Sequence, residues 1–284
     1  MRACRALLAA PLVLLSGCGS SGSGPAVPTV SAAKTFHLAG FSPTGAVRAG
    51  VPTTISFTVD QPSGAPLTTY RTGPGPHTSV HLIIVRRDLA TIIHRHPPIG
   101  ADGRVSESVT FAKPGPYRVL VDVYPKLSGV LRNFQLFANV DVAKNGVSGT
   151  YEPQPLPPFL PTVIVDGYRF QMHATPHLRA ISPASLPVTV TEPSGRPATF
   201  TPWYGALGHA IFFRTGTLDY FHTHICGPNT PACAGFGAPI IGHSSTPGKL
   251  QVGILLPVSG TWRLFLQCKV DGHVLTAPFT LKVA

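Results

Sequence analysis

Short runs in which apolar and polar residues alternate make up most of this chain, with turn residues roughly every ten positions. Two clear runs are 133–142 and 275–283, in which every second side chain is apolar. A period of two places successive side chains on opposite faces of a β-strand. No stretch keeps the 3.6-residue period of a helix over a useful length. The pattern therefore predicts an all-β, antiparallel protein.

Three sequence features occur in the same order in both halves of the chain. A strand running into a Pro-Ser-Gly turn occupies 58–64 and again 189–195. A histidine-containing segment follows in each half, and then a turn and an alternating strand begin at Gly115 and at Gly260. The repeated order indicates an internal duplication.

We expect this duplication to form two tandem β-sandwich domains, at 34–143 and 163–284. A proline-rich linker joins them at 144–162, where proline fixes φ and removes hydrogen-bond donors. Roughly seven short strands a half predict an immunoglobulin-like (Ig-like) sandwich. A cupredoxin-like barrel is the alternative, because both are antiparallel Greek-key folds. Each half is long enough to bury its own core.

The N-terminal residues 1–17 have the features of a bacterial export signal. Basic residues precede an apolar run at 6–15 that is too short to span a bilayer. The following Leu-Ser-Gly-Cys18 resembles the bacterial lipobox, in which the chain is cleaved before the cysteine and the thiol is acylated. The resemblance implies a flexible tether at 18–33 and a protein held on the outer face of the cell membrane by acyl chains such as palmitate. An ordinary secretory signal with a fortuitous cysteine is the alternative.

Composition narrows the choice of partners. The formal net charge is +11 and charged residues are 12% of the chain. No run of Lys and Arg is interleaved with aromatic residues, which argues against nucleic acid as a partner. We expect a mild attraction to anionic lipid headgroups or wall polymers, and another envelope protein as a further partner.

Six of the 12 histidines occur in two sets with identical spacing. In each set, a histidine is followed thirteen residues later by a His-x-His pair. The six are His81, His94, His96, His209, His222 and His224. Imidazole is the commonest metal ligand in proteins, so we predict one three-histidine site for copper or zinc in each half.

Hairpin geometry explains how each set converges. Residues opposed in a hairpin have a constant index sum, so a two-residue turn at Arg87-Asp88 places His81 opposite His94 (81 + 94 = 175). The same construction for the second set (209 + 222 = 431) centres a turn on Thr215-Gly216. The remaining histidine of each set lies two residues along, on the same face.

Other side chains complete or compete with these sites. Cys226 would join the second set if its strand continues, but it also pairs naturally with Cys233 as a disulfide. His77 and Asp122 are candidates for a fourth ligand in the first set, and Cys268 is predicted to be a buried thiol. Five further histidines share no spacing with the two sets, and we interpret them as surface or turn residues: His37, His173, His177, His243 and His273.

The second half contains Tyr-Gly-Ala-Leu-Gly-His209 and then Leu-Asp-Tyr-Phe-His222-Thr-His224. This resembles a motif of secreted and lipid-anchored bacterial proteins, especially actinobacterial ones, in which a Gly-His strand precedes an Asp-Leu-x-Tyr-x-His-x-His-Pro segment. The first half shows a variant of it. The resemblance implies an exported β-sandwich with a suspected link to metals. The second half departs from the motif where Ile225-Cys226 replaces the proline.

We therefore expect a surface-anchored lipoprotein that binds copper or zinc as a buffer, chaperone or sensor. The alternative is a structural or adhesive Ig-like module of the envelope without metal, whose histidines donate to carbonyls or waters and stabilise the hairpin. Sensing of pH through shared protonation is a third interpretation of the histidines. We expect no enzyme, because no nucleophile triad or phosphate loop is present and the chain has only 11 Asp and Glu.

Replacing Cys18 with alanine tests the lipid anchor. We expect the unchanged protein, expressed in a bacterial host, to fractionate with membranes and to incorporate a palmitate analogue. The Cys18→Ala variant should do neither, because the acylated thiol is lost. Equal membrane association of both proteins would contradict the anchor.

Overall fold

Strands are the only regular elements among the residues described by the computed structural model of the protein. These residues are 35–72, 79–127, 133–144, 151–173, 175–225, 228 and 246–284. Almost all strand pairings are antiparallel, and the predicted all-β fold class is confirmed. In this part of the chain no helix is long and apolar enough to cross a bilayer.

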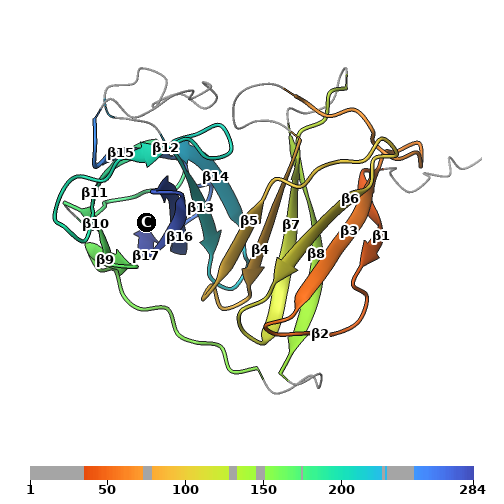
Figure 1. The fold of residues 1–284 in the computed structure, drawn as a ribbon, viewed down its shortest axis with the longest axis horizontal. Coiled ribbons are helices and arrows are strands. Elements are labelled where there is room, and N and C mark those ends of the chain that lie inside the picture. The colour runs from red at the N-terminus through yellow and green to blue at the C-terminus, as the bar shows by residue number, and fades with distance from the viewer. Residues whose placement is uncertain are drawn as a thin grey trace, which may run out of the picture. The chain divides into compact units, whose positions relative to one another are not determined.

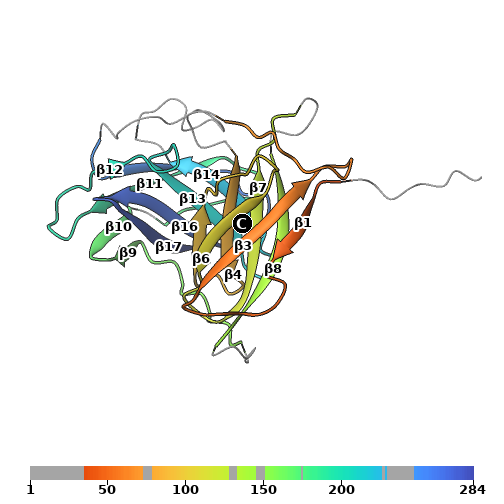
Figure 2. The ribbon, with the colours of Figure 1, turned by 45° about the vertical axis from the view of Figure 1, so that its right-hand side comes forward.

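The first half folds into two sheets. Its strands are β1 (His37–Ser42), β2 (Val47–Arg48), β3 (Pro52–Asp60), β4 (Val80–Arg86), β5 (Ile92–Arg95), β6 (Val105–Thr110), β7 (Gly115–Val123) and β8 (Phe134–Ala143). One sheet has the order β1-β3-β6 and the other β2-β8-β7-β4-β5. Figure 2 shows β3 lying obliquely across β7 and β8. This distribution of strands is that of an Ig-like sandwich, and we call it the first sandwich.

Alternation along the strands builds the core of the first sandwich. Ile55 and Phe57 on β3 belong to one buried cluster with Val119 and Val121 on β7. Most polar residues between the apolar ones on β3 and β6 are at least partly exposed, whereas Ser56 is buried and accepts a hydrogen bond from Arg104 Nη2 at 3.1 Å. Burial of this apolar surface is the main favourable term in folding the domain.

The second half repeats the arrangement. Its strands are β9 (Thr162–Val165), β10 (Tyr168–Met172), β11 (Ala184–Thr191), β12 (Phe200–Thr201), β13 (Gly208–Arg214), β14 (Tyr220–Ile225), β15 (Lys249–Ile254), β16 (Gly260–Val270) and β17 (His273–Val283). One sheet runs β15-β11-β10-β9, and in the other β16 pairs with β12, β13 and β17 while β13 pairs with β14 (Figure 1). A single cluster fills the space between the sheets of this second sandwich.

Strands β4 and β13 are buried on both faces. Leu82 and Ile84 on β4 point into the core of the first sandwich. Ile83, one position along, belongs instead to a third cluster shared with Ile211 and Phe213 of β13. Strands β13 and β14 lie beside β4 and β5 in Figure 1, as this shared cluster requires. We call the third cluster the interface cluster; it is built by Ile83, Val85, Leu89, Leu120, Ile211, Phe213, Leu218 and Phe265.

The hairpin between β4 and β5 turns over four residues, so the predicted two-residue turn is wrong. Arg86 N donates to Thr91 O at 3.1 Å, which closes the four-residue loop. Ile83 pairs with His94, an index sum of 177 (83 + 94) rather than the predicted 175. Leu89 in the loop has a φ of 61°, and its side chain is buried in the interface cluster. Burial of this leucine stabilises the longer loop at a strained backbone angle.

The hairpin between β13 and β14 has the same four-residue loop. Arg214 N donates to Asp219 O at 2.9 Å, and Ile211 pairs with His222, an index sum of 433 (211 + 222) rather than 431. Leu218 has a φ of 60° and is buried in the interface cluster, as Leu89 is in the first hairpin. Both predicted registers are thus wrong by two residues. Because side chains alternate with a period of two, this error leaves every histidine on its predicted face.

The export signal, Cys18, Cys226 and Cys233 lie outside the residues that the structure describes. The domain boundaries stay a prediction. Cys268 is a buried free thiol, as predicted, and burial raises its pKa to about 12. It therefore serves as a small apolar side chain in the core of the second sandwich.

The same substitution at two isoleucines tests the double burial of β4. Ile83→Ala should lower the free energy of unfolding by about 2–5 kcal/mol, because it opens a cavity in the interface cluster. Ile164→Ala, at a side chain that is 60% exposed, should cost less than about 1 kcal/mol. Urea denaturation measures both. Equal losses in the two variants would show that the outer face of β4 is not buried.

Candidate metal centre

All six predicted histidines lie on the covered faces of two hairpins, one from each sandwich. His81 has the same parity on β4 as Ile83, and His209 has the same parity on β13 as Ile211. On β14, His224 pairs directly with His209. His81, His94, His209 and His224 are buried, whereas His96 and His222 are partly buried. The strand periodicity that buries the interface cluster therefore also buries the imidazoles, which we call the histidine cluster.

Ring nitrogens of this cluster approach one another across the two sandwiches. His81 Nδ1 lies 3.3 Å from His222 Nδ1. His222 Nε2 lies 3.2 Å from His209 Nδ1. Within the first sandwich, His94 Nε2 lies 3.2 Å from His96 Nε2. The two predicted sets are therefore not separate: they meet in one place.

Three groups of three histidines have ligand atoms within 4.8 Å of one another. They are His81, His222 and His224; His81, His94 and His96; and His94, His209 and His222. The second of these is the predicted first set, brought together as expected. The predicted second set is not itself one of the groups found among the described residues, because its members combine with histidines of the first sandwich. Two of the three groups are therefore composite.

Neighbouring acceptors orient two of the imidazoles. His209 Nε2 lies 3.0 Å from the Trp203 carbonyl oxygen, which can only accept, so this nitrogen carries the proton. His94 Nδ1 lies 3.1 Å from Gln267 Oε1, whose amide nitrogen donates to Thr276 Oγ1 at 3.0 Å. His209 Nδ1 and His94 Nε2 are left as lone pairs that point into the cluster. Metal-ligating histidines are commonly held in this way by an acceptor on the other ring nitrogen.

An aromatic turn packs against one side of the cluster. Tyr204 and Gly205 both have positive φ, 49° and 76°, as the central residues of a type I′ turn do. The turn places the Tyr204 ring 3.9 Å from the His96 ring at an interplanar angle of 3°. The opposite face of His96 stacks on His81 at 4.0 Å and 15°. His96 is therefore held flat between two rings.

Asp122, one of two candidates for a fourth ligand, is beside His81 in the β4–β7 ladder but belongs to none of the three groups. Its oxygens accept four hydrogen bonds, from Asn133 Nδ2, Gln135 Nε2, Tyr124 Oη and Tyr220 Oη. Burial raises the pKa of Asp122, and these bonds oppose the rise. Tyr220 comes from the second sandwich, so the carboxylate connects the two sandwiches. The other candidate, His77, lies outside the described residues.

Burial keeps three histidines of the cluster neutral. The pKa of His94 and that of His222 lie well below 6.5, first because of burial and then because of neighbouring histidines. Burial and the same kind of neighbours also lower the pKa of His96. Neutral imidazole is the form that binds metal ions, so no proton has to leave these three rings before an ion can bind at physiological pH.

The spacing of the ring nitrogens suits a transition-metal ion. Ligands about 2.0 Å from a tetrahedral zinc ion lie about 3.3 Å from one another. Neutral nitrogen ligands at such distances favour zinc or copper over magnesium or calcium, which prefer oxygen. The same distances also allow hydrogen bonds between imidazoles, so the geometry supports either use.

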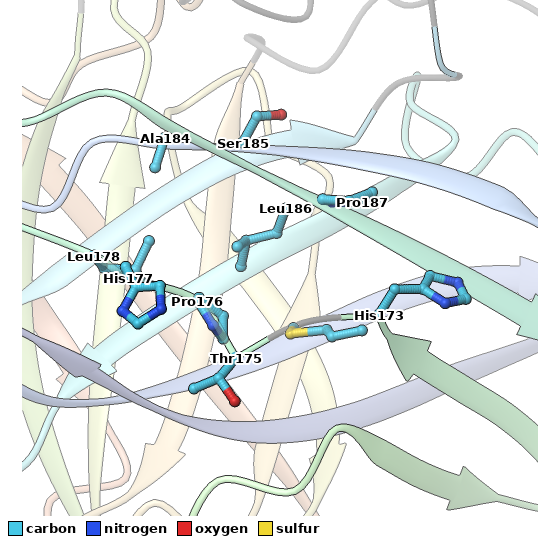
Figure 3. A pocket seen from close by; sticks show the side chains of 10 residues that line it. His173, Thr175, Pro176, His177, Leu178, Ala184, Ser185, Leu186 and Pro187 are labelled. Atoms are coloured by element: carbon cyan, nitrogen blue, oxygen red, sulfur yellow. The ribbon is translucent and has the colours of Figure 1, made fainter.

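Two histidines outside the cluster line a separate pocket of about 200 Å³ in the second sandwich. His173 and His177 are exposed, and Figure 3 shows their rings at opposite ends of the lining. His173 Nε2 contacts Thr189 Oγ1 at 3.1 Å. These positions agree with their interpretation as surface residues.

Sequence reasoning missed the side chains that support the cluster. Four side chains contact or orient its members, but only a fold that joins the halves gives them this role: Trp203, Tyr204, Tyr220 and Gln267. One signal was present: the run from Val80 to Val85 has apolar residues at both parities, which is typical of a strand buried on both faces.

Comparisons with known proteins add a family. A family described as a domain of unknown function (DUF8832) matches residues 35–142 and 162–284. No curated protein matches the chain significantly.

Several solved structures are distantly similar. Fibronectin(III)-like modules of Clostridium thermocellum CbhA are 13% identical over 88% of this chain and 93% of theirs, with a TM-score of 0.21. The bacterial integrin-binding protein invasin is 15% identical over 88% of this chain and 38% of its own, with a TM-score of 0.23. A putative membrane anchored protein from Corynebacterium diphtheriae is 9% identical over 87% and 57%, with a TM-score of 0.24. No function follows from these likenesses.

Acid should destabilise the fold through the histidine cluster. In the unfolded chain His94, His96 and His222 take up protons below about pH 6.5, but in the fold their lowered pKa values keep them neutral. Stability is therefore fully present above pH 6.5 and is lost as the pH falls, by about 1.4 kcal/mol per group and pH unit. Urea unfolding from pH 7.5 to 5.5, with a chelator present, should show this loss. A midpoint that stays constant over this range would contradict it.

Proposed function

The chain belongs to the DUF8832 family, whose function is unknown, and we propose that it is an exported, lipid-anchored protein that binds copper or zinc at the histidine cluster. One observation carries the proposal: buried histidines from both sandwiches bring ring nitrogens within 4.8 Å in three overlapping groups. Polar side chains that only keep a protein soluble lie on its exposed surface. The six imidazoles lie instead in the covered interface of the two hairpins, where burying polar groups costs free energy.

The orientation of the rings supports binding of an ion over a purely structural role. Lone pairs of His209 and His94 point into the cluster, because Trp203 and Gln267 occupy their other nitrogens. Lowered pKa values keep protons from competing with the ion. Hydrogen bonds between neutral rings can also satisfy the ring nitrogens of the cluster without metal. In this alternative the protein is a structural envelope module, and the titration below distinguishes that role from metal binding.

The remaining parts of the proposal come from the sequence. The lipobox-like segment ending at Cys18 supports an anchor on the outer face of the cell membrane. In that place a buried site fits a buffer, chaperone or sensor for metal, with another envelope protein as a partner in transfer. We propose that the protein binds metal and is not an enzyme; in the cluster, His94 contacts the Gln267 amide, His209 contacts the Trp203 carbonyl, and His96 stacks on the Tyr204 ring.

Titration of the purified, chelator-treated protein with zinc or copper tests this function. We expect uptake of at least one equivalent. Ion at about 100-fold over its dissociation constant should stabilise the fold by about 2.7 kcal/mol and raise Tm by roughly 5–10 °C. His94→Ala should reduce both uptake and the Tm shift, because this residue belongs to two of the three groups.

The matched control is His173→Ala, which removes an exposed histidine outside the cluster and should bind metal as the unchanged protein does. If the unchanged protein takes up no metal while His94→Ala lowers its stability, the cluster is structural and the proposed function is wrong.

A further inference from the structure

Both ring nitrogens of His222 face another imidazole. Its Nδ1 lies 3.3 Å from His81 Nδ1, on the first sandwich. Its Nε2 lies 3.2 Å from His209 Nδ1, on the second sandwich. Both distances match the separation of two ligands on one tetrahedral ion, about 3.3 Å. The ring therefore has a potential metal position at each end.

Two of the three-histidine groups contain His222 and extend from it in different directions, as its two ring nitrogens do. His81, His222 and His224 form one group, and His94, His209 and His222 form another. His222 is the only residue that these two groups share. Each group has two histidines of its own, so both can be filled at once if His222 uses one nitrogen for each.

We propose that the histidine cluster is a dinuclear metal centre in which the imidazole of His222 bridges two ions. The proposal rests on the proposed function and extends it from metal binding to a pair of neighbouring ions. The first ion takes His81, His222 and His224, and the second takes His94, His209 and His222. Each ion then has ligands from both sandwiches, so loading the pair joins the two domains.

Proton balance follows from this arrangement. Neutral His222 has one N–H and one lone pair, so it binds the first ion without losing a proton. The second ion needs the other nitrogen, and the N–H proton must leave to solvent to give an imidazolate with a lone pair at each end. Two dications beside the ring compensate its negative charge. Uptake of the second equivalent therefore releases one proton, and uptake of the first releases none.

His96 distinguishes this centre from the competing arrangement. The group of His81, His94 and His96 draws one residue from each proposed position, so an ion there excludes the pair. In the proposed centre His96 binds no ion: it packs between the rings of Tyr204 and His81, and its Nε2 lies 3.2 Å from His94 Nε2. Removing His96 or His222 thus has opposite consequences in the two arrangements.

Titration of the purified protein with Cu²⁺, followed by electron paramagnetic resonance, tests the bridge. We expect two equivalents per chain. The first should give the signal of isolated Cu²⁺, and the second should lower the integrated intensity well below two spins, with a half-field transition from the coupled pair. Calorimetry in buffers of different ionisation enthalpy should detect one proton released with the second equivalent only. His96→Ala should keep two equivalents and the coupling, whereas His222→Ala should lose the coupling.

Each other outcome has one meaning. No uptake by the unchanged protein overturns the proposed function together with the bridge. One equivalent with an isolated signal, abolished by His96→Ala, overturns the bridge alone and assigns the ion to His81, His94 and His96. Two equivalents without coupling or proton release also overturn the bridge. Because the stoichiometry, the coupling and the proton release are measured on the unchanged protein, a failure of His222→Ala to fold does not remove the test.

Discussion

In an isolated sandwich the outer faces of β4 and β13 would meet water, whereas here they share one apolar cluster built by residues such as Ile83, Ile211 and Phe213. This burial excludes water from the neighbouring positions on the same faces, where the histidines lie. Loss of solvation is the first cause of the lowered pKa values of His94 and His222. A packing interaction between domains thus keeps these histidines neutral, which is the protonation state that the proposed metal binding requires.

The duplication gives the centre an approximate symmetry that the sequence then breaks. Asp122 on β7 pairs with His81 on β4, and Gln267 on β16 pairs with His209 on β13. Asp122 and Gln267 therefore occupy equivalent places in their sandwiches. Gln267 accepts from His94 of the other sandwich, while Asp122 accepts from Tyr220 of the other sandwich. The acid is thereby saturated with hydrogen bonds outside the cluster, and the amide orients His94 inside it. The two halves accordingly contribute differently to the candidate centre and do not form two copies of it.

The fold class and the faces of the histidines follow from alternation along each strand, which needs no knowledge of the tertiary structure. The register does not, because the length of the hairpin loop depends on Leu89 and Leu218, whose side chains are buried by the opposite sandwich. The pairing of the two sets was also out of reach, since spacing within one half carries no information on how the halves meet. The apolar residues at both parities of β4 were the one local sign that its outer face is covered.

The central claim is that histidines of both sandwiches bind metal together in one buried place. A crystal structure of the zinc-loaded protein, with anomalous diffraction measured on either side of the zinc edge, tests it most directly. The account predicts anomalous density bounded by His94 of the first sandwich and by His209 and His222 of the second. Density confined to the histidines of one sandwich, or at exposed residues only, would contradict it.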